Sequence, residues 1–496
     1  MRDALFHIRP DSPLSIQAQI RELIVDAVLS GQLPPGDPLP SCRAMAKRLR
    51  VSRNTVVYAY QRLVDDGFLT ARERSGFYVA EDVMQGRVAP QAADGMAHAA
   101  RGPAPDMQRR FRIRPSRQQN IRKPQDWRKL PYPFIYGQTD TELFPLAEWR
   151  DCARQVLGRR MFDEVTNDMM GADDPVLVEQ IRTHLLPRRG VTAAADEVLI
   201  TLGAQNALYL LASLLLQPSD TVVMGDPGYP DFRNLAQLRT NRLRTIAVDE
   251  GGLPIDGRLE GAEYIFVTPS HHFPTTVTMP LARRRALLEY AAEHDCLVIE
   301  DDYEPEANYI SEPTPALKSM DRDGRVLYVG SLSKSLFPGL RLGYIVAPRE
   351  VITELRALRR LMLRHAPTEL QRIAGLFIAQ GHHDTFVKRM ARTYERRWTC
   401  MRDALNRHLP GTAQAPSFGG TSFWVEGPPD LDADALAERA LKRGLFFEAG
   451  RVHFAGDRPP TNFFRLGFSS IAENRIEPGI ELLAQLIGTP PTARVG

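Results

Sequence analysis

Short apolar runs alternate with helix-like segments through the middle of this 496-residue chain, and this alternation constrains the fold more than any other feature. Runs rich in Val, Ile and Leu include "EVLIT", "DTVVMG", "EYIFV", "CLVIE" and "RVLYVG". Segments with helical spacing, such as "LARRRALLEYAAEHD", separate them. Strands that alternate with helices form a mainly parallel sheet, whose ligands bind beyond the carboxyl ends of the strands. We therefore predict an α/β domain over residues 131–496.

Polar residues stand at the ends of two of these runs. Asp301 and Tyr303 follow "CLVIE", Ser331 and Lys334 follow "RVLYVG", and Arg341 comes seven residues after Lys334. An unpaired lysine at a strand end is a desolvated amine with a lowered pKa, which imine formation with an aldehyde requires. A carboxylate can hold a proton on a pyridine nitrogen, and serine and arginine can bind phosphate.

A glycine turn adds an anion-binding helix terminus. In "TLGAQNAL" the backbone N–H groups of Gly203 and Ala204 would point at a bound anion. Pyridoxal 5′-phosphate combines an aldehyde, a pyridine nitrogen and a phosphate, so these residues together predict a site for this cofactor. The alternative is that Asp301 and Lys334 form a structural ion pair and that the glycine turn only joins a strand to a helix.

The first eighty residues predict a different kind of unit. Apolar residues recur at helical spacing in "SIQAQIRELIVDAVL". A short helix is predicted from Ser41, a turn at Val51 and Ser52, and a second helix ending near Gly67. The segment "FLTARERSGFYVA" then reads as a β-hairpin. Residues 1–80 are therefore predicted to form a winged helix-turn-helix.

The second of these helices opens with residues suited to DNA. Its first turn enters the major groove in such units, where Arg and Asn side chains pair with base edges. Arginines before it and in the hairpin are placed to meet phosphates. An ordinary solvated surface is the alternative for each charge taken alone. The residues predicted to contact DNA are Arg43, Ser52, Arg53, Asn54, Thr55, Arg72 and Arg74.

Residues 81–130 change character and are predicted to be a flexible basic linker. They are rich in Ala, Pro, Arg and Gln, without a sustained period, and carry 11 Lys/Arg against 5 Asp/Glu. Residues 131–496, by contrast, carry 41 against 47. The linker charge either keeps this segment solvated or follows DNA phosphates.

Cysteines and hydropathy favour a cytoplasmic protein. The four cysteines lie far apart, form no C-x-x-C pair and are expected to be free thiols, and no metal site is predicted. The N-terminus lacks an apolar signal segment, and the longest apolar run, "ALYLLASLLL", is too short to span a bilayer.

The whole chain resembles a known family. Residues "LPSCRAMAKRLRVSRNTVVYAYQRLVDDGFLTARERSGFYV" resemble the winged helix-turn-helix of GntR-type bacterial regulators, and residues 131 to about 490 resemble fold-type I aminotransferases. Their order is that of the MocR family of transcription regulators, and "PSHHFPTTVTMP" and "IEDDYEPE" also look like segments of that family. The resemblance implies a homodimer and a smaller C-terminal subdomain, which we place from about residue 370.

The resemblance also implies roles for single residues. Lys334 would be the imine lysine, Asp301 the partner of the pyridine nitrogen and Tyr303 a donor to the ring hydroxyl. Tyr229 would stack on the ring, and Arg465 would bind the acid group of an effector. The phosphate cup would consist of Gly203, Ala204, Ser331 and Arg341.

Three positions beside the cofactor depart from the family. Phe273 stands where transaminases usually carry an asparagine that contacts the ring hydroxyl, which fits sensing better than fast turnover. His272 replaces a common Gln and Thr276 a common Gly. Residues 167–191 also lack most of the usual Y-G-D-x-x-G pattern, which in related dimers approaches the neighbouring subunit's site.

These features predict a regulator that is not an enzyme and has no catalytic residues. An amine or amino acid would exchange into the imine at Lys334 and alter the binding of operator DNA. The first alternative is an active aminotransferase with a DNA-tethering N-terminus, in which a half-reaction is possible. The second is a regulator that senses the cofactor itself.

Overall fold

A computed structural model of the chain describes residues 7–9, 11–73, 75–85, 106–310, 314–413, 416 and 419–488. It contains two compact units, Met1–Arg110 and Phe111–Gly496. No helix in these described ranges has the length and apolar character needed to cross a membrane.

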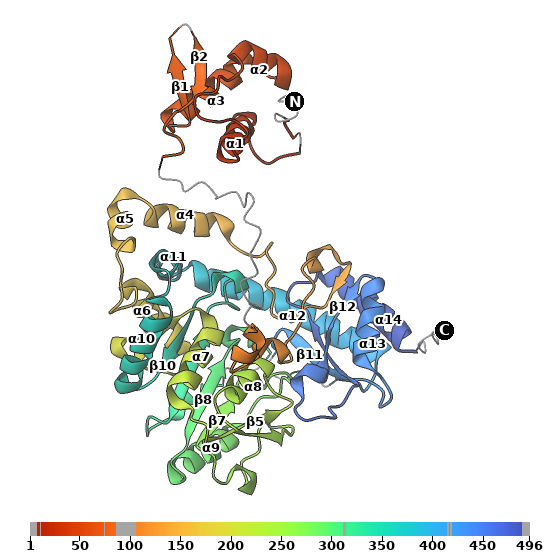
Figure 1. Ribbon diagram of the computed structural model, residues 1–496. Helices are drawn as coiled ribbons and strands as arrows, with labels where there is room; N and C mark the ends of the chain where they lie inside the picture. Colours follow the sequence, from red (N-terminus) through yellow and green to blue (C-terminus); the bar gives the residue numbers. More distant parts are fainter. Residues whose placement is uncertain are drawn as a thin grey trace. The chain divides into compact units, whose positions relative to one another are not determined.

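The first unit is the predicted winged helix-turn-helix, which is confirmed (Figure 1). Ser41 and Ser52 cap their helices as predicted, because each hydroxyl accepts the backbone N–H three residues on. A buried core around Ile24, Val56 and Tyr60 holds the helices together. The elements are α1 (Ile16–Leu29), α2 (Cys42–Leu49), α3 (Arg53–Asp65), β1 (Leu69–Arg72) and β2 (Gly76–Val79).

The second unit is built on a seven-stranded sheet, and the predicted α/β class is confirmed. Five neighbouring strands are parallel, and β10 runs antiparallel to both of its neighbours. In spatial order the strands are β4 (Val198–Thr201), β10 (Gly343–Val346), β9 (Val326–Ser331), β8 (Leu297–Asp302), β7 (Tyr264–Val267), β5 (Thr221–Asp226) and β6 (Arg242–Ala247).

Helices bury both faces of this sheet, which explains why its strands read as continuous apolar runs. The helices beside the sheet are α6 (Pro175–Gln180), α7 (Gly203–Leu215), α8 (Pro230–Gln237), α9 (Leu281–Glu293), α10 (Arg349–Leu363) and α11 (Thr368–Ala379). Successive residues of β5 show the alternation, since Val222 and Met224 join the core under α7 and α8, and Val223 joins the core under α9.

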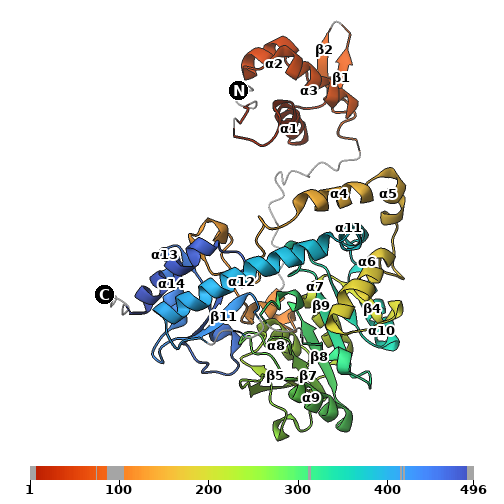
Figure 2. The same cartoon turned by 180° about the vertical axis from the view of Figure 1, so that it is seen from behind.

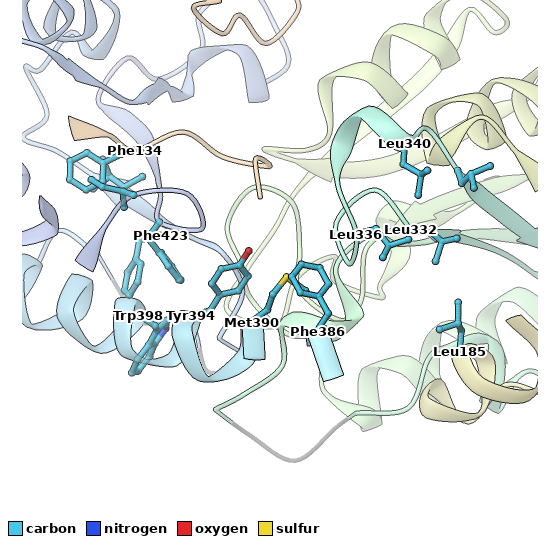
Figure 3. Close-up of a cluster of buried hydrophobic side chains, with 14 of the residues drawn as sticks. Phe134, Leu185, Leu332, Leu336, Leu340, Phe386, Met390, Tyr394, Trp398 and Phe423 are labelled. Carbon is cyan, nitrogen blue, oxygen red and sulfur yellow. The ribbon is translucent and has the colours of Figure 1, made fainter. Parts of the chain in front are cut away.

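A smaller sheet and the long helix α12 (His382–His408) form the C-terminal part of this unit (Figure 2). Buried side chains spaced four residues apart, from Phe386 to Trp398, follow α12 from Leu336, in the turn after β9, to Phe423 of the small sheet (Figure 3). The remaining elements are β3 (Tyr132–Pro133), α4 (Leu146–Val156), α5 (Arg159–Val165), β11 (Ser422–Glu426), α13 (Ala433–Lys442), β12 (Leu445–Phe446), β13 (Glu448–Ala449), β14 (Phe463–Gly467) and α14 (Glu473–Gly488).

Residues 118–120, within the segment that composition assigns to the linker, pack on α8. Gln118 donates a hydrogen bond to the carbonyl of Asn234 (2.9 Å), and the Asn234 amide donates to Gln119 (2.9 Å) and Asn120 (3.1 Å). By its contacts, the chain from Phe111 onward belongs to the second compact unit.

Candidate functional site

A cavity of about 390 Å³ lies where the carboxyl ends of β8 and β9 meet the start of α7. Parallel strands bring their carboxyl ends to one edge, so residues far apart in sequence meet there. Of the residues predicted to hold a cofactor, the cavity is lined by Ala204, Tyr229, Asp301, Tyr303, Ser331, Lys334 and Arg341. Gly203 precedes this lining as the first residue of α7.

Two adjacent aspartates at the end of β8 have opposite surroundings. Asp302 accepts hydrogen bonds from Arg189 (2.7 Å), Ser270 (2.7 Å) and Tyr328 (2.9 Å), so its charge is compensated inside the fold. The Oδ1 atom of Asp301 is buried and finds no hydrogen-bond partner among the described residues. Burial and the charge of Asp302 raise the pKa of Asp301 to about 7, although Lys334 opposes them. Asp301 therefore presents a free acceptor to the cavity.

Lys334 is partly buried, and its Nζ lies 4.3 Å from the centre of the Tyr136 ring. Burial lowers the pKa of Lys334 to about 8, and nearby Glu304 opposes that shift. Within the described ranges Lys334 forms no salt bridge, so the structural ion pair with Asp301 is not made. An amine with this pKa is unprotonated in about one molecule in ten at pH 7, far more often than an ordinary lysine, and can act as a nucleophile.

Another part of the cavity wall is suited to an anion. Gly203 begins α7 with a φ of +78°, and a Cβ atom there would lie 3.1 Å from the Arg341 guanidinium. Glycine therefore lets this arginine approach the helix N-terminus, where it donates to the carbonyl of Leu202 (3.2 Å). Ser331 accepts the N–H of Ser333, whose own buried hydroxyl has no partner among the described residues. Ser333 lines the cavity as well.

Aromatic side chains close one side of the cavity. Tyr229 donates to Gln205 (3.0 Å) and lies near Asp231 (3.2 Å), while Tyr303 donates to the carbonyl of His271 (3.2 Å). The ring of Phe273 lies 5.0 Å from that of Tyr229 and 5.8 Å from that of Tyr303, edge to face. Phe273, which stands where transaminases usually carry an asparagine, therefore makes apolar contacts at this position.

The substituted loop beside Phe273 keeps a backbone conformation that favours glycine. Thr276, which replaces the common glycine, has a φ of +65°. A β-branched residue is disfavoured there by contact between Cβ and the backbone. The loop thus retains the glycine-like turn at a cost in strain.

Arg465 is buried on β14 and already has an ionic partner. Its guanidinium contacts Glu448 (2.5 Å), which lies opposite it on the neighbouring strand β13 and also contacts His453 (2.7 Å). Burial opposes ionisation of Glu448, but Arg465 and His453 hold its pKa at about 2. The guanidinium carbon lies 3.6 Å from the Tyr136 ring centre, and Arg465 is not part of the cavity lining.

Several lining residues were missed by the sequence reasoning. Thr268 directly follows strand β7, so its position at a strand end could have singled it out. Gln205 and Asp231 also line the cavity, and each lies two residues after a predicted site residue, Gly203 and Tyr229. Ile121 and Lys123 come from the segment taken as linker, and no local pattern pointed to them.

In the first unit, Ser52 and Thr55 act as a helix cap. The Ser52 hydroxyl accepts the N–H of Thr55 (3.1 Å) and lies 2.7 Å from the Thr55 hydroxyl. Arg53 and Asn54 are exposed in the first turn of α3. Tyr58, one turn after Asn54, is 65% exposed and was missed, although its spacing places it on the same helix face.

The other predicted DNA contacts lie around α3. Arg43 is exposed in the first turn of α2. Arg72, at the end of β1, is paired with exposed Glu81 (2.9 Å) and covers the ring of Tyr78. Arg74 lies outside the described residues.

The cavity fits pyridoxal 5′-phosphate on three observations. Within the part of the chain that the structure describes, Asp301 offers a buried acceptor without a partner and Lys334 an amine without a salt bridge. The start of α7 with Arg341 offers an anion-binding end. Among the described residues, no group of three or more His, Cys, Asp or Glu side chains is arranged to hold a metal ion.

Both units of the chain are similar to known protein families. Residues 16–79 match bacterial regulatory proteins of the gntR family, and residues 140–483 match aminotransferase class I and II. The HTH-type transcriptional regulator TauR of Rhodobacter capsulatus is 42% identical over 482 residues, covering 97% of this chain and 98% of that protein. The probable rhizopine catabolism regulatory protein MocR of Rhizobium meliloti is 28% identical, covering 95% and 94%. A crystal structure of Pyrococcus horikoshii kynurenine aminotransferase in complex with PMP has a TM-score of 0.70 and 26% identity, covering 78% of this chain and 99% of that chain.

Proposed function

Because this chain belongs to the MocR family of GntR-type bacterial transcription regulators, we propose that it binds operator DNA and changes that binding when an amine or amino acid enters its cofactor pocket. The observation that carries the proposal is the presence of both features in one chain: a capped helix with an exposed first turn, and a strand-end pocket whose lysine forms no salt bridge within the described ranges. As a DNA-binding protein it would act in the cytoplasm.

For DNA, α3 would enter the major groove with its first turn. Arg53 and Asn54 would contact base edges, and Ser52 and Thr55 would hold the helix terminus against the phosphate backbone. Arg43, Arg72 and Arg74 would contact phosphates, for which Arg72 would have to leave its exposed partner Glu81. An exposed pair of this kind costs little to break.

The domain belongs to a class that binds pyridoxal 5′-phosphate, and different pocket residues would hold different parts of this cofactor. When bound, this cofactor supplies an aldehyde that condenses with primary amines. Lys334 would hold it covalently, Asp301 would accept the ring N–H, and Tyr303 would donate to the ring hydroxyl. Tyr229 would pack against the ring, and Gly203, Ala204, Ser331 and Arg341 would bind the phosphate.

An effector would place its amine at Lys334 and its acid group toward the cationic side chains around the Tyr136 ring, among which the sequence had singled out Arg465. For this to regulate DNA binding, the effector must bind one conformation of a homodimer more tightly than another. The small subdomain that carries Arg465 is the element proposed to close.

An active aminotransferase is the second candidate, favoured by the aminotransferase fold and by a lysine with a lowered pKa. Two features favour the regulator. Phe273 contributes apolar contacts where a polar ring contact is usual in transaminases, and Arg465 already has its charge compensated by Glu448.

The test is an absorbance spectrum of the purified protein with the cofactor, alongside Lys334→Ala and with amines titrated in. We expect a visible cofactor band that Lys334→Ala lacks, a change on adding one amine, and a parallel change in affinity for DNA selected from random sequence. Continuous release of a keto product would instead establish the aminotransferase. A wild-type protein without the band would remove the cofactor from the proposal.

A further inference from the structure

Lys123 reaches the pocket from the segment that precedes the aminotransferase-like fold. Its Nζ donates to the carbonyl of Tyr136 (2.7 Å), and the residue lines the cavity. Asn120, three residues earlier, is held on α8 by Asn234. The lysine is therefore fixed on both sides, from the helix and from the pocket wall.

Three cationic groups surround the ring of Tyr136. The Arg465 guanidinium carbon lies 3.6 Å from the ring centre, Lys334 Nζ lies 4.3 Å from it, and Lys123 Nζ lies 5.7 Å from it. A Cβ atom on Gly137 would lie 2.3 Å from Lys334 Nζ and 3.5 Å from Lys123 Nζ. The two amines thus face the same glycine and repel each other, which favours an anion at this end of the pocket.

These three cations differ in what compensates them. Arg465 is neutralised by Glu448, and Lys334 is reserved for the cofactor. Lys123 is exposed as a whole residue, but its amine end enters the cavity and forms no salt bridge within the described ranges. Burial of this end and the charge of Arg465 lower the pKa of Lys123, and Glu448 and Asp231 oppose that shift by longer-range attraction. Of these three cations, Lys123 is therefore the one whose charge is neither compensated nor assigned to the cofactor.

We propose that Lys123 binds the acid group of the effector and thereby selects amino acids over simple amines. This rests on the proposed function, in which the effector's amine reacts at the cofactor. The effector is then a compact amino acid with a carboxylate or sulfonate, because its two charged ends must reach Lys334 and Lys123, which lie side by side. Lys123 is a specificity-determining residue and not a catalytic one.

The test uses the full-length protein loaded with cofactor and follows the visible absorbance during titration. The probes are matched pairs that differ by the acid group: glycine with methylamine, β-alanine or 2-aminoethanesulfonate with ethylamine, and 4-aminobutyrate with propylamine. Lys123→Met removes the charge and keeps an unbranched stem, whereas Lys123→Arg keeps the charge. Arg122→Met removes the exposed neighbouring charge as the matched control.

For the amino acids that wild type prefers, Lys123→Met is expected to weaken binding about tenfold or more, the loss of one hydrogen bond to a charged group. The matched amines should change less than about twofold. Lys123→Arg should restore the preference, and Arg122→Met should keep it.

An unchanged preference for acids in Lys123→Met would overturn the role of Lys123 and leave the proposed function standing. Equal weakening of amino acids and plain amines would also overturn it, because that pattern indicates a structural role. If wild-type protein with bound cofactor responds to none of the probes, the amine-sensing function itself fails.

Discussion

At the scale of single residues, the pair Asp301 and Asp302 shows how position along a strand sets the work of a carboxylate. Adjacent strand residues point to opposite sides of the sheet, so one faces Arg189 in the interior and the other faces the pocket. Their chemistry is identical, and their partners are not.

Asparagine substitutions should distinguish the structural role of Asp302 from the proposed cofactor-binding role of Asp301. Asp302→Asn removes the charge that Arg189 needs, and we expect a loss of unfolding free energy of about 3 kcal/mol or more. Asp301→Asn should leave the cofactor-free protein at least as stable as wild type and weaken cofactor binding. Thermal unfolding and a cofactor titration on both variants measure this. A strongly destabilised Asp301→Asn would contradict the assignment.

The pH dependence of stability follows from the same residue. Asp301 titrates at about 7 in the fold against an ordinary value of 3.8, so between these values the unfolded chain has lost a proton that the folded chain keeps. Stability of the cofactor-free protein therefore falls as pH rises from about 4 to about 7. Asp301→Asn should lack this part of the slope in denaturant unfolding measured across that pH range.

The sequence allowed Asp301 to be singled out, yet it gave no sign that Arg465 is paired. Glu448 and Arg465 face each other because β13 and β14 pair in that register, and register depends on the turn and packing between them. Lys123 was missed for a similar reason, since only the bonds of residues 118–120 to α8 bring it to the pocket.

At the scale of elements, α3 combines a helix cap with the exposed surface that we propose contacts DNA. The sequence predicted its start at Ser52 because hydroxyl capping is a local interaction, and the structure confirms it. Tyr58 could be identified only from the geometry of the folded helix, which places it on the same exposed face as Asn54.

Two alanine substitutions should distinguish the cap from the reading surface. Ser52→Ala should cost about 1 kcal/mol of stability in the first unit, because the N–H of Thr55 loses its acceptor. Tyr58→Ala should change stability by less than about 0.5 kcal/mol, since the ring is exposed, and should weaken DNA binding. Thermal unfolding and binding to DNA selected by wild type give the two readouts. Unchanged DNA affinity in Tyr58→Ala would remove this residue from the interface.

At the scale of the whole molecule, the order and class of the two units could be predicted because each has dense local signals. The interface of the proposed homodimer could not be predicted in this way, because no sequence motif identifies the residues that form it. Leu361 on α10 is 85% exposed, and Met362 beside it is 43% exposed. Neighbouring exposed apolar side chains form a patch, and such patches mark protein–protein contact surfaces more often than isolated apolar residues do.

A charge on α10 should therefore break the dimer. Leu361→Glu is expected to shift the protein from dimer to monomer in sedimentation velocity, because a carboxylate would be buried without a partner. Leu441→Glu, on an exposed leucine of α13, is the matched control and should stay dimeric. A dimeric Leu361→Glu would place the interface elsewhere.

The attachment of Lys123 and Asn120 gives the chain a mechanical property. Any pull from the DNA-reading unit travels along the backbone and reaches these two residues before it reaches β3. If the chain binds operator DNA and an amino acid as proposed above, an operator whose spacing stretched this segment would work against the hydrogen bond at Tyr136 and loosen the acid end of that amino acid. Spacing between half-sites on DNA would then tune how much effector is needed, so that promoters of different geometry respond at different concentrations.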